Sequence, residues 1–96
     1  MQYSFEWDPV KAKENVRKHG VSFERAAHVF LDPFAVSVFD DEHSSYEDRW
    51  ITIAQNGNEV ILVVVHTFRE LDTNHSNVRL ISARKATKSE TKQYRG

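Results

Sequence analysis

The sequence predicts an α+β fold in which an antiparallel meander of four main strands packs with helices. The apolar run 60–65 is hydrophobic on both faces, as expected of a central strand in a sheet. Asn56-Gly57, just before this run, is a strong β-hairpin signal. Two helix starts, at Asp8-Pro9 and at Ser22, precede the four strands. The expected fold therefore has a short N-terminal strand, two N-terminal helices, the meander and a C-terminal helix.

The first third of the chain is expected to form a strand and two helices. Residues 3–7 alternate aromatic and polar side chains, which indicates a short strand. Asp8 is a suitable helix N-cap, and Gly20 is expected to end this first helix just after His19. A second helix begins after Ser22 and ends at Asp32-Pro33. Its inner face carries Phe23, Ala26, Ala27 and Phe30.

The rest of the chain is rich in strand signals. β-Branched and aromatic residues mark four strand candidates, at 34–39, 50–54, 61–68 and 78–83. Residues 72–77 are polar and are expected to connect the last two strands. Thr87 and Glu90 form a capping box at the start of a C-terminal helix that runs to about Tyr94.

Length and composition suit one modest core, so residues 1–96 are expected to form a single domain. The chain has no cysteine, which excludes disulfides and thiolate metal sites. Glu6 and Asp8 lie where a signal peptide needs an apolar core, and no apolar run is long enough for a membrane span. We expect a cytoplasmic protein without membrane contact.

Charge is distributed unevenly along a chain whose net charge is −1. Residues 31–48 hold six acidic and no basic side chains, whereas residues 77–96 hold six basic side chains and one acidic. This asymmetry indicates an electropositive site at the C-terminal end beside an acidic segment. A solvated basic helix is the alternative explanation.

Three arginines near the ends of the last strands are candidate phosphate ligands, because a guanidinium binds phosphate through two parallel hydrogen bonds. Arg69 follows the apolar strand, and Arg79 and Arg84 lie at either end of the last strand. In a meander we expect Arg69 and Arg79 to be neighbours, with Arg84 toward the other end. The two-residue period of a strand places Arg79 and Arg84 on opposite faces. Surface ion pairs with the acidic segment are the alternative role.

Candidate proton carriers lie in two places. His19 ends the first helix, and a histidine titrates near neutral pH. A polar stripe on the same helix consists of Lys11, Asn15 and Lys18. An ordinary solvated face, with His19 as a C-terminal cap, is the alternative. Glu47, with Arg49 two residues later, is a second candidate proton acceptor beside a phosphate ligand.

No metal or other cofactor is expected. The five histidines show no pair at metal-ligand helical spacing. The acidic segment 40–48 carries oxygen ligands that suit a divalent cation, but its spacing does not match a calcium loop.

Both ends of the chain resemble the BrnT family of toxins. In the N-terminal half the resemblance rests on Phe5-Glu6-Trp7-Asp8, Lys11, Asn15, Lys18-His19-Gly20-Val21, Phe23, Phe30 and Asp32-Pro33. Glu47 and Arg49 follow at the usual place. The C-terminal signature comprises Ile81-Ser82-Ala83-Arg84-Lys85-Ala86-Thr87, Glu90 and Tyr94. The resemblance covers nearly the whole chain, and the combination of both ends is specific.

This resemblance implies a toxin of a type II toxin–antitoxin pair with a RelE-like ribonuclease fold. It implies a BrnA-like antitoxin, a ribbon-helix-helix protein through which the complex binds operator DNA. Our hypothesis is metal-independent cleavage of RNA that inhibits translation, with catalytic roles for His19, Glu47, Arg69 and Arg84. Supporting RNA contacts are assigned to Lys18, Arg49, Arg79 and Lys85. The alternative is a non-catalytic binding module that acts as co-repressor with its antitoxin.

Overall fold

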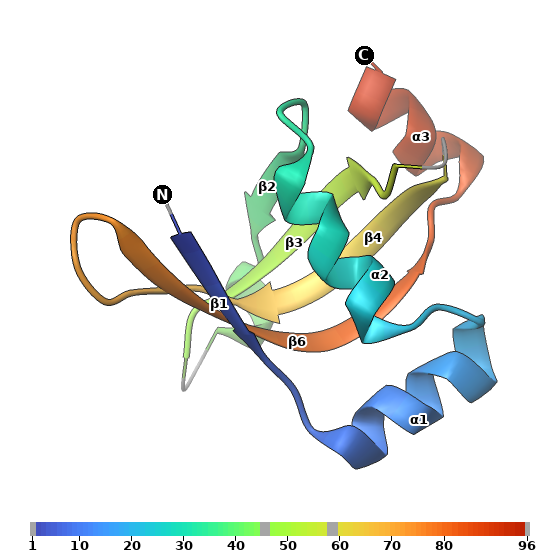
Figure 1. Ribbon diagram of the computed structural model, residues 1–96. Helices are drawn as coiled ribbons and strands as arrows, with labels where there is room; N and C mark the ends of the chain where they lie inside the picture. Colours follow the sequence, from blue (N-terminus) through green and yellow to red (C-terminus); the bar gives the residue numbers. More distant parts are fainter. Residues whose placement is uncertain (1, 45–46, 58–59, 96) are drawn as a thin grey trace.

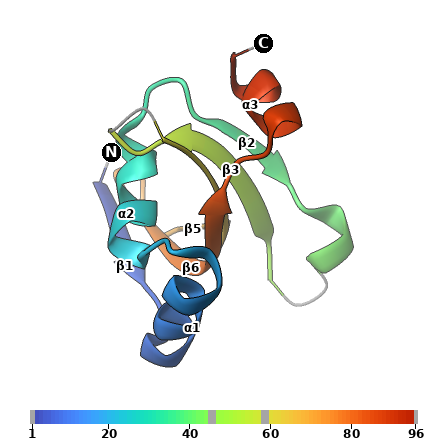
Figure 2. The same cartoon turned by 90° about the vertical axis from the view of Figure 1, so that its right-hand side faces the viewer.

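A curved six-stranded sheet carries the fold, with α1 and α2 grouped on one side and α3 beyond the end of β6 (Figures 1 and 2). The computed structural model describes residues 2–44, 47–57 and 60–95. The helices are α1 (Pro9–His19), α2 (Phe23–His28) and α3 (Lys88–Arg95), with short 3₁₀ turns at Val29–Leu31 and Asp41–His43. The strands are β1 (Gln2–Glu6), β2 (Val36–Phe39), β3 (Arg49–Gln55), β4 (Ile61–Thr67), β5 (Arg69–Glu70) and β6 (His75–Lys85).

The sheet contains the expected meander and two additions to it. Strands β2, β3, β4 and β6 pair antiparallel in that order. The N-terminal strand β1 pairs parallel with the first half of β6, which makes the sheet mixed and places β1 at its edge. The short strand β5 pairs antiparallel with the same half of β6. The sequence did not indicate either of these pairings. The pattern of apolar residues in a strand shows which of its faces is buried, but not which other strand it pairs with.

Two strands, β2 and β6, begin at least two residues away from the expected position. The polar connection expected at 72–77 is shorter, because the strand β6 already begins at His75. The Leu71 N–H donates to the His75 carbonyl at 2.9 Å, which closes a tight turn that projects from the body (Figure 1). The strand expected at 34–39 begins only at Val36. The Asp32 carboxylate accepts from the Phe34 N–H at 2.9 Å and holds the residues before β2 in a turn.

A β-bulge interrupts the regular alternation of β6. Val65 of β4 lies opposite Ser82, but its neighbour His66 lies opposite Leu80, so the register skips Ile81. The extra residue reverses the direction of every side chain that follows it in β6. A bulge of this kind depends on the partner strand and is not visible in the sequence of β6 alone.

The bulge places the arginines of β6 on one face of the sheet. The core residues Val78, Leu80 and Ala83 all belong to one cluster and therefore point the same way. Arg79 and Arg84 consequently point to the opposite face, and the expectation that strand parity separates them is wrong. The register of β3, β4 and β5 adds two more arginines to this face. We call it the arginine face, and its members are Arg49, Arg69, Arg79 and Arg84.

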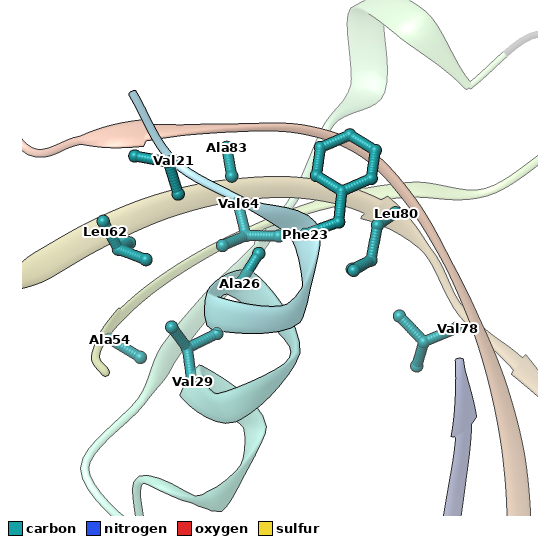
Figure 3. Packing of buried hydrophobic residues seen from close by; sticks show 10 residues of the cluster. All are labelled: Val21, Phe23, Ala26, Val29, Ala54, Leu62, Val64, Val78, Leu80 and Ala83. Atoms are coloured by element: carbon teal, nitrogen blue, oxygen red, sulfur yellow. The ribbon is translucent and has the colours of Figure 1, made fainter. Parts of the chain in front are cut away.

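The main core lies between α2 and the other face of the sheet (Figure 3). Phe23, Ala26 and Val29 follow a helical spacing and are completely buried. They pack against β4 and β6 residues such as Val64 and Leu80. Complete burial of Phe23 stabilises the fold by about 2–3 kcal/mol relative to an exposed ring. A second, smaller cluster of Ile53, Ile61 and Val63 lies on the arginine face under α3.

Helix α1 begins and ends where the sequence predicts. The Asp8 side chain accepts from the Val10 N–H at 2.8 Å, and Gly20 ends the helix in the left-handed conformation at φ 67°. Asn15, however, is not part of a solvated stripe, because it is only 5% exposed. Its amide nitrogen donates to the Ala83 carbonyl at 2.7 Å, and its oxygen accepts from the Ala83 N–H at 3.1 Å. Asn15 thus acts as a strand partner for the second half of β6, where β1 has ended.

Helix α3 is fixed at both of its ends. Thr87 and Glu90 form the expected capping box, with the Thr87 N–H donating to Glu90 at 2.9 Å and the Glu90 N–H donating to Thr87 at 3.2 Å. At the far end the Tyr94 hydroxyl donates to Asp32 at 2.6 Å. Burial opposes ionisation of Asp32, but hydrogen bonds from Tyr94 and two main-chain N–H groups give it a lowered pKa. None of the helices in the described part of the chain is long and apolar enough to cross a membrane.

Candidate functional site

A polar pocket of about 310 Å³ lies on the arginine face where β4, β5 and β6 meet. It is lined by Glu6, Glu47, Asp48, Thr67, Phe68, Arg69, Asn77 and Arg79. Three of the residues that the sequence analysis selected, Glu47, Arg69 and Arg79, are therefore brought together. The meander accounts for this, because the end of β4 and the start of β6 meet at one end of the sheet.

The two arginines of the polar pocket are in different states. Arg79 forms an ion pair with Glu47, which lies 32 residues earlier in the chain. The Arg79 N–H also donates to the Thr67 hydroxyl at 3.3 Å, which fixes its backbone. Arg69 is exposed on β5 and makes no ion pair with any of the described residues. Its guanidinium is therefore the cation of the pocket that is available to an incoming anion.

Arg49 stands beside the polar pocket. It is the first residue of β3 and lies directly opposite Thr67, a residue of the pocket wall. The Arg49 N–H is held by the Ser44 hydroxyl at 3.0 Å, and its carbonyl accepts from the Asp40 N–H at 2.8 Å. The acidic segment thus positions the start of β3, and Arg49 adds a cation beside the wall of the polar pocket at Thr67.

Arg84 lies at the other end of the arginine face and is already occupied. Its two terminal nitrogens donate to the two carboxylate oxygens of Glu90 at 2.7 and 2.8 Å. This bidentate ion pair occupies the two N–H groups of the guanidinium with which Arg84 would bind a phosphate. The ion pair raises the pKa of Arg84 and lowers the pKa of Glu90 from 4.5 to about 2, against the opposing effect of burial. Arg84 therefore joins β6 to α3 in the free protein.

Replacement of Glu90 by glutamine is expected to destabilise the fold in a pH-dependent way. Because the pKa of Glu90 is lower in the folded than in the unfolded chain, the ion pair stabilises fully above pH 4.5 and is lost as the pH falls toward 2. We expect a loss of about 1 kcal/mol at neutral pH, since solvent screens the half-exposed Arg84. Urea unfolding measures the free energy at each pH, with the exposed Glu42→Gln as control. A difference between Glu90→Gln and wild type that persists at about pH 2 would contradict this role.

The remaining selected residues lie outside the polar pocket. His19 and Lys18 are exposed in the last turn of α1, where Lys18 lies 3.7 Å from Glu14. Asn15 anchors this helix beside Ala83, on the half of β6 that is far from the polar pocket. Lys85 lies opposite Leu62, a residue of the main core cluster, and so belongs to the face opposite Arg84. The structure does not bring His19, Lys18 or Lys85 together with Glu47.

Sequence reasoning missed two acidic residues of the pocket. Glu6 of β1 lies opposite Arg79 in the parallel pairing, and Asp48 lies between Glu47 and Arg49. The alternation of residues 3–7 gives the signal for Glu6, because the aromatic side chains face the core and leave Glu6 on the arginine face. With Glu6, Glu47 and Asp48 against Arg69 and Arg79, the pocket combines proton acceptors with cations. Among the described residues, no group of three or more histidine, aspartate and glutamate side chains is arranged to hold a metal ion.

Comparison with known proteins identifies the family. Residues 7–90 match the family described as the ribonuclease toxin BrnT of a type II toxin–antitoxin system. The fold is similar to the crystal structure of the Brucella abortus ribonuclease toxin BrnT, with a TM-score of 0.61 and 21% sequence identity. That similarity covers 92% of this chain and 100% of the Brucella chain. A search of curated proteins gave no match. Because the family match spans most of the sequence, from Trp7 to Glu90, the chain belongs to the BrnT family of ribonuclease toxins.

Proposed function

We propose that residues 1–96 form one toxin domain that cleaves RNA in the cytoplasm without a metal ion and thereby inhibits translation. The proposal depends on one observation above the others: Glu47, Arg69 and Arg79 line the same polar pocket. Cleavage of RNA by its own 2′-hydroxyl needs a base and cations for the developing phosphorane charge. The polar pocket offers both within one small volume, in a domain that we expect to share the fold of RelE-like ribonucleases.

In this mechanism the RNA phosphate binds Arg69 and replaces Glu47 as the partner of Arg79. Glu47 is then released to accept the proton of the 2′-hydroxyl. The 2′-oxygen forms a bond to phosphorus, the bond from phosphorus to the 5′-oxygen breaks, and the leaving oxygen takes up a proton from solvent water. The products are a 2′,3′-cyclic phosphate and a 5′-hydroxyl end. Arg49 and Arg69 stabilise the charge that develops on the phosphoryl oxygens.

The other selected residues receive secondary roles in this proposal. Arg84 supports the site by holding α3 through Glu90, and becomes a phosphate ligand only if that pair opens. Lys18 and Lys85 are exposed and suit contacts with more distant RNA phosphates. We assign proton transfer to Glu47 in preference to His19, because His19 does not line the polar pocket.

The direct test incubates the purified chain with an RNA transcript in the presence of EDTA. We expect cleavage that leaves 2′,3′-cyclic phosphate ends, because the nucleophile is the 2′-oxygen. Loss of cleavage on chelation would refute metal independence, and absence of cleavage with or without magnesium would refute the ribonuclease proposal. In cells, expression of the chain alone is expected to stop protein synthesis, and co-expression of the neighbouring gene, for a BrnA-like ribbon-helix-helix antitoxin, is expected to restore it.

A binding module is the second candidate function. The observation that favours it is that Arg79 and Arg84 are each neutralised by a glutamate in the free protein. On this view the chain acts as a co-repressor, and it is held at operator DNA only through its complex with the antitoxin. Stable ternary complexes with operator DNA, together with no growth arrest and no RNA cleavage, would support this function over the first.

A further inference from the structure

A groove lined by aromatic side chains runs across the face of the sheet that carries α2, opposite the polar pocket. It consists of two adjoining cavities, of about 580 and 230 Å³, that share Tyr3 and Phe30 as walls. Phe5, Trp7 and Leu31 line the larger cavity, and Trp50 and Phe68 line the smaller one. We call this the aromatic groove.

The walls of the aromatic groove are preorganised. The Tyr3 and Phe30 rings lie 5.7 Å apart, and the Phe5 and Phe30 rings lie 5.3 Å apart. Phe30 also meets the buried His66 ring edge to face at 4.8 Å. Tilted aromatic packing of this kind stabilises the side chains in place. Binding of a ligand in the groove therefore costs little conformational entropy of the protein side chains.

A chain of polar groups forms the floor of the smaller cavity. The His66 Nδ1 donates to the Thr67 carbonyl at 3.0 Å, so its Nε2 accepts from the Thr52 hydroxyl at 2.7 Å. Thr52 in turn accepts from the exposed Ser37 hydroxyl at 2.8 Å. Burial lowers the pKa of His66 and keeps the ring neutral. Among the described residues, none donates a hydrogen bond to the Ser37 hydroxyl, so its lone pairs can accept from an N–H donor at the mouth of the cavity.

The rim of the aromatic groove combines exposed apolar side chains with negative charge. Leu31 is 76% exposed and Tyr3 is 36% exposed, so both side chains are accessible to a partner. Phe39 meets the ring of Trp50, a wall of the smaller cavity, edge to face with ring centres 5.2 Å apart. Asp40, Asp41 and Glu42 follow Phe39 in the chain. Glu24 lines the larger cavity, and no lysine or arginine among the described residues lines either cavity. An RNA occupant is therefore disfavoured, since its phosphates would be repelled.

We propose that the aromatic groove is the docking surface for the antitoxin, through a segment that carries an aromatic or branched aliphatic anchor next to lysine or arginine residues. The inference rests on the proposed toxin–antitoxin function and adds where, and by what chemistry, the partner binds. Apolar anchors fill the two cavities, and the basic residues face the acidic rim. Phe68 lines both the groove and the polar pocket, but Leu31 does not line the polar pocket, so a change at Leu31 leaves the cleavage site intact.

The test is the affinity of the purified chain for its cognate antitoxin. Leu31→Arg removes an apolar contact and adds a charge that repels a basic segment, and we expect binding to weaken by about tenfold or more. The matched control is Val16→Arg, the same kind of change at a side chain that is 48% exposed on α1. The double variant Asp41→Asn, Glu42→Gln is expected to weaken binding at low salt and to have little effect at high salt.

Growth assays separate this inference from the proposed function. We expect Leu31→Arg to arrest growth as the wild type does, but no longer to be rescued by the antitoxin. An affinity for the antitoxin within about threefold of the wild type would overturn the inference. Self-association of the chain that Leu31→Arg abolishes would also overturn it, by assigning the groove to a second copy. If the wild type binds antitoxin through the groove but never arrests growth, the docking surface stands and the toxin function fails.

Discussion

Replacement of Arg69 by alanine is expected to lower the rate of RNA cleavage by about 100- to 1,000-fold, the usual effect of removing one donor to a developing oxyanion. Arg69 is the cation of the polar pocket that has no ion-pair partner among the described residues, so it is ready to bind phosphate. Because its side chain is exposed and unpaired, the free energy of unfolding should change little. A fluorogenic RNA substrate gives the rate, and urea unfolding gives the stability.

The matched control for this change is Arg17→Ala. Arg17 is also an exposed arginine, but it lies on α1 and pairs with Glu14 at 2.9 Å. We expect its cleavage rate to stay within about twofold of the wild type, as for most surface substitutions. If Arg69→Ala cleaves RNA as fast as Arg17→Ala, Arg69 does not contact the reacting phosphate, and the polar pocket is not the site of cleavage.

Replacement of Asn15 by leucine is expected to lower the free energy of unfolding by about 3 kcal/mol. The leucine has the same branched arrangement of heavy atoms but no polar group, so it leaves the Ala83 N–H and carbonyl without their partner. It also removes the bond of 2.9 Å from the Asn15 amide to the Val21 carbonyl. Buried main-chain groups that lose a partner are costly, because water cannot replace it. Urea unfolding followed by tryptophan fluorescence measures the change.

Lys11→Leu provides the comparison for Asn15→Leu. Lys11 lies one helical turn earlier on α1 and is exposed. We expect an effect below about 0.5 kcal/mol there. Equal losses in the two variants would show that the hydrogen bonds of Asn15 to β6 do not stabilise the fold.

The sequence alone determined the elements whose signals are local. Asp8, Ser22 and the pair of Thr87 and Glu90 each cap a helix through a bond to a residue at most three positions away. The apolar run of β4 and the Asn-Gly pair before it indicated a central strand in a hairpin, and the meander fixed that Arg69 and Arg79 are neighbours. These features follow from the dihedral preferences of single residues and from contacts between strands that are adjacent in the chain. Both can be inferred from a short stretch of sequence.

Only the tertiary structure decided which side chains share a face and which cations are occupied. The bulge at Ile81 exists because β6 pairs with β4, and it moves Arg84 onto the same face as Arg79. Asn15 looked like a surface residue until Ala83, 68 positions later, proved to be its partner. The pairing of Arg79 with Glu47 likewise joins residues 32 positions apart. Such contacts depend on the register of whole strands, so the residues that make them carry no signal of their own in the sequence.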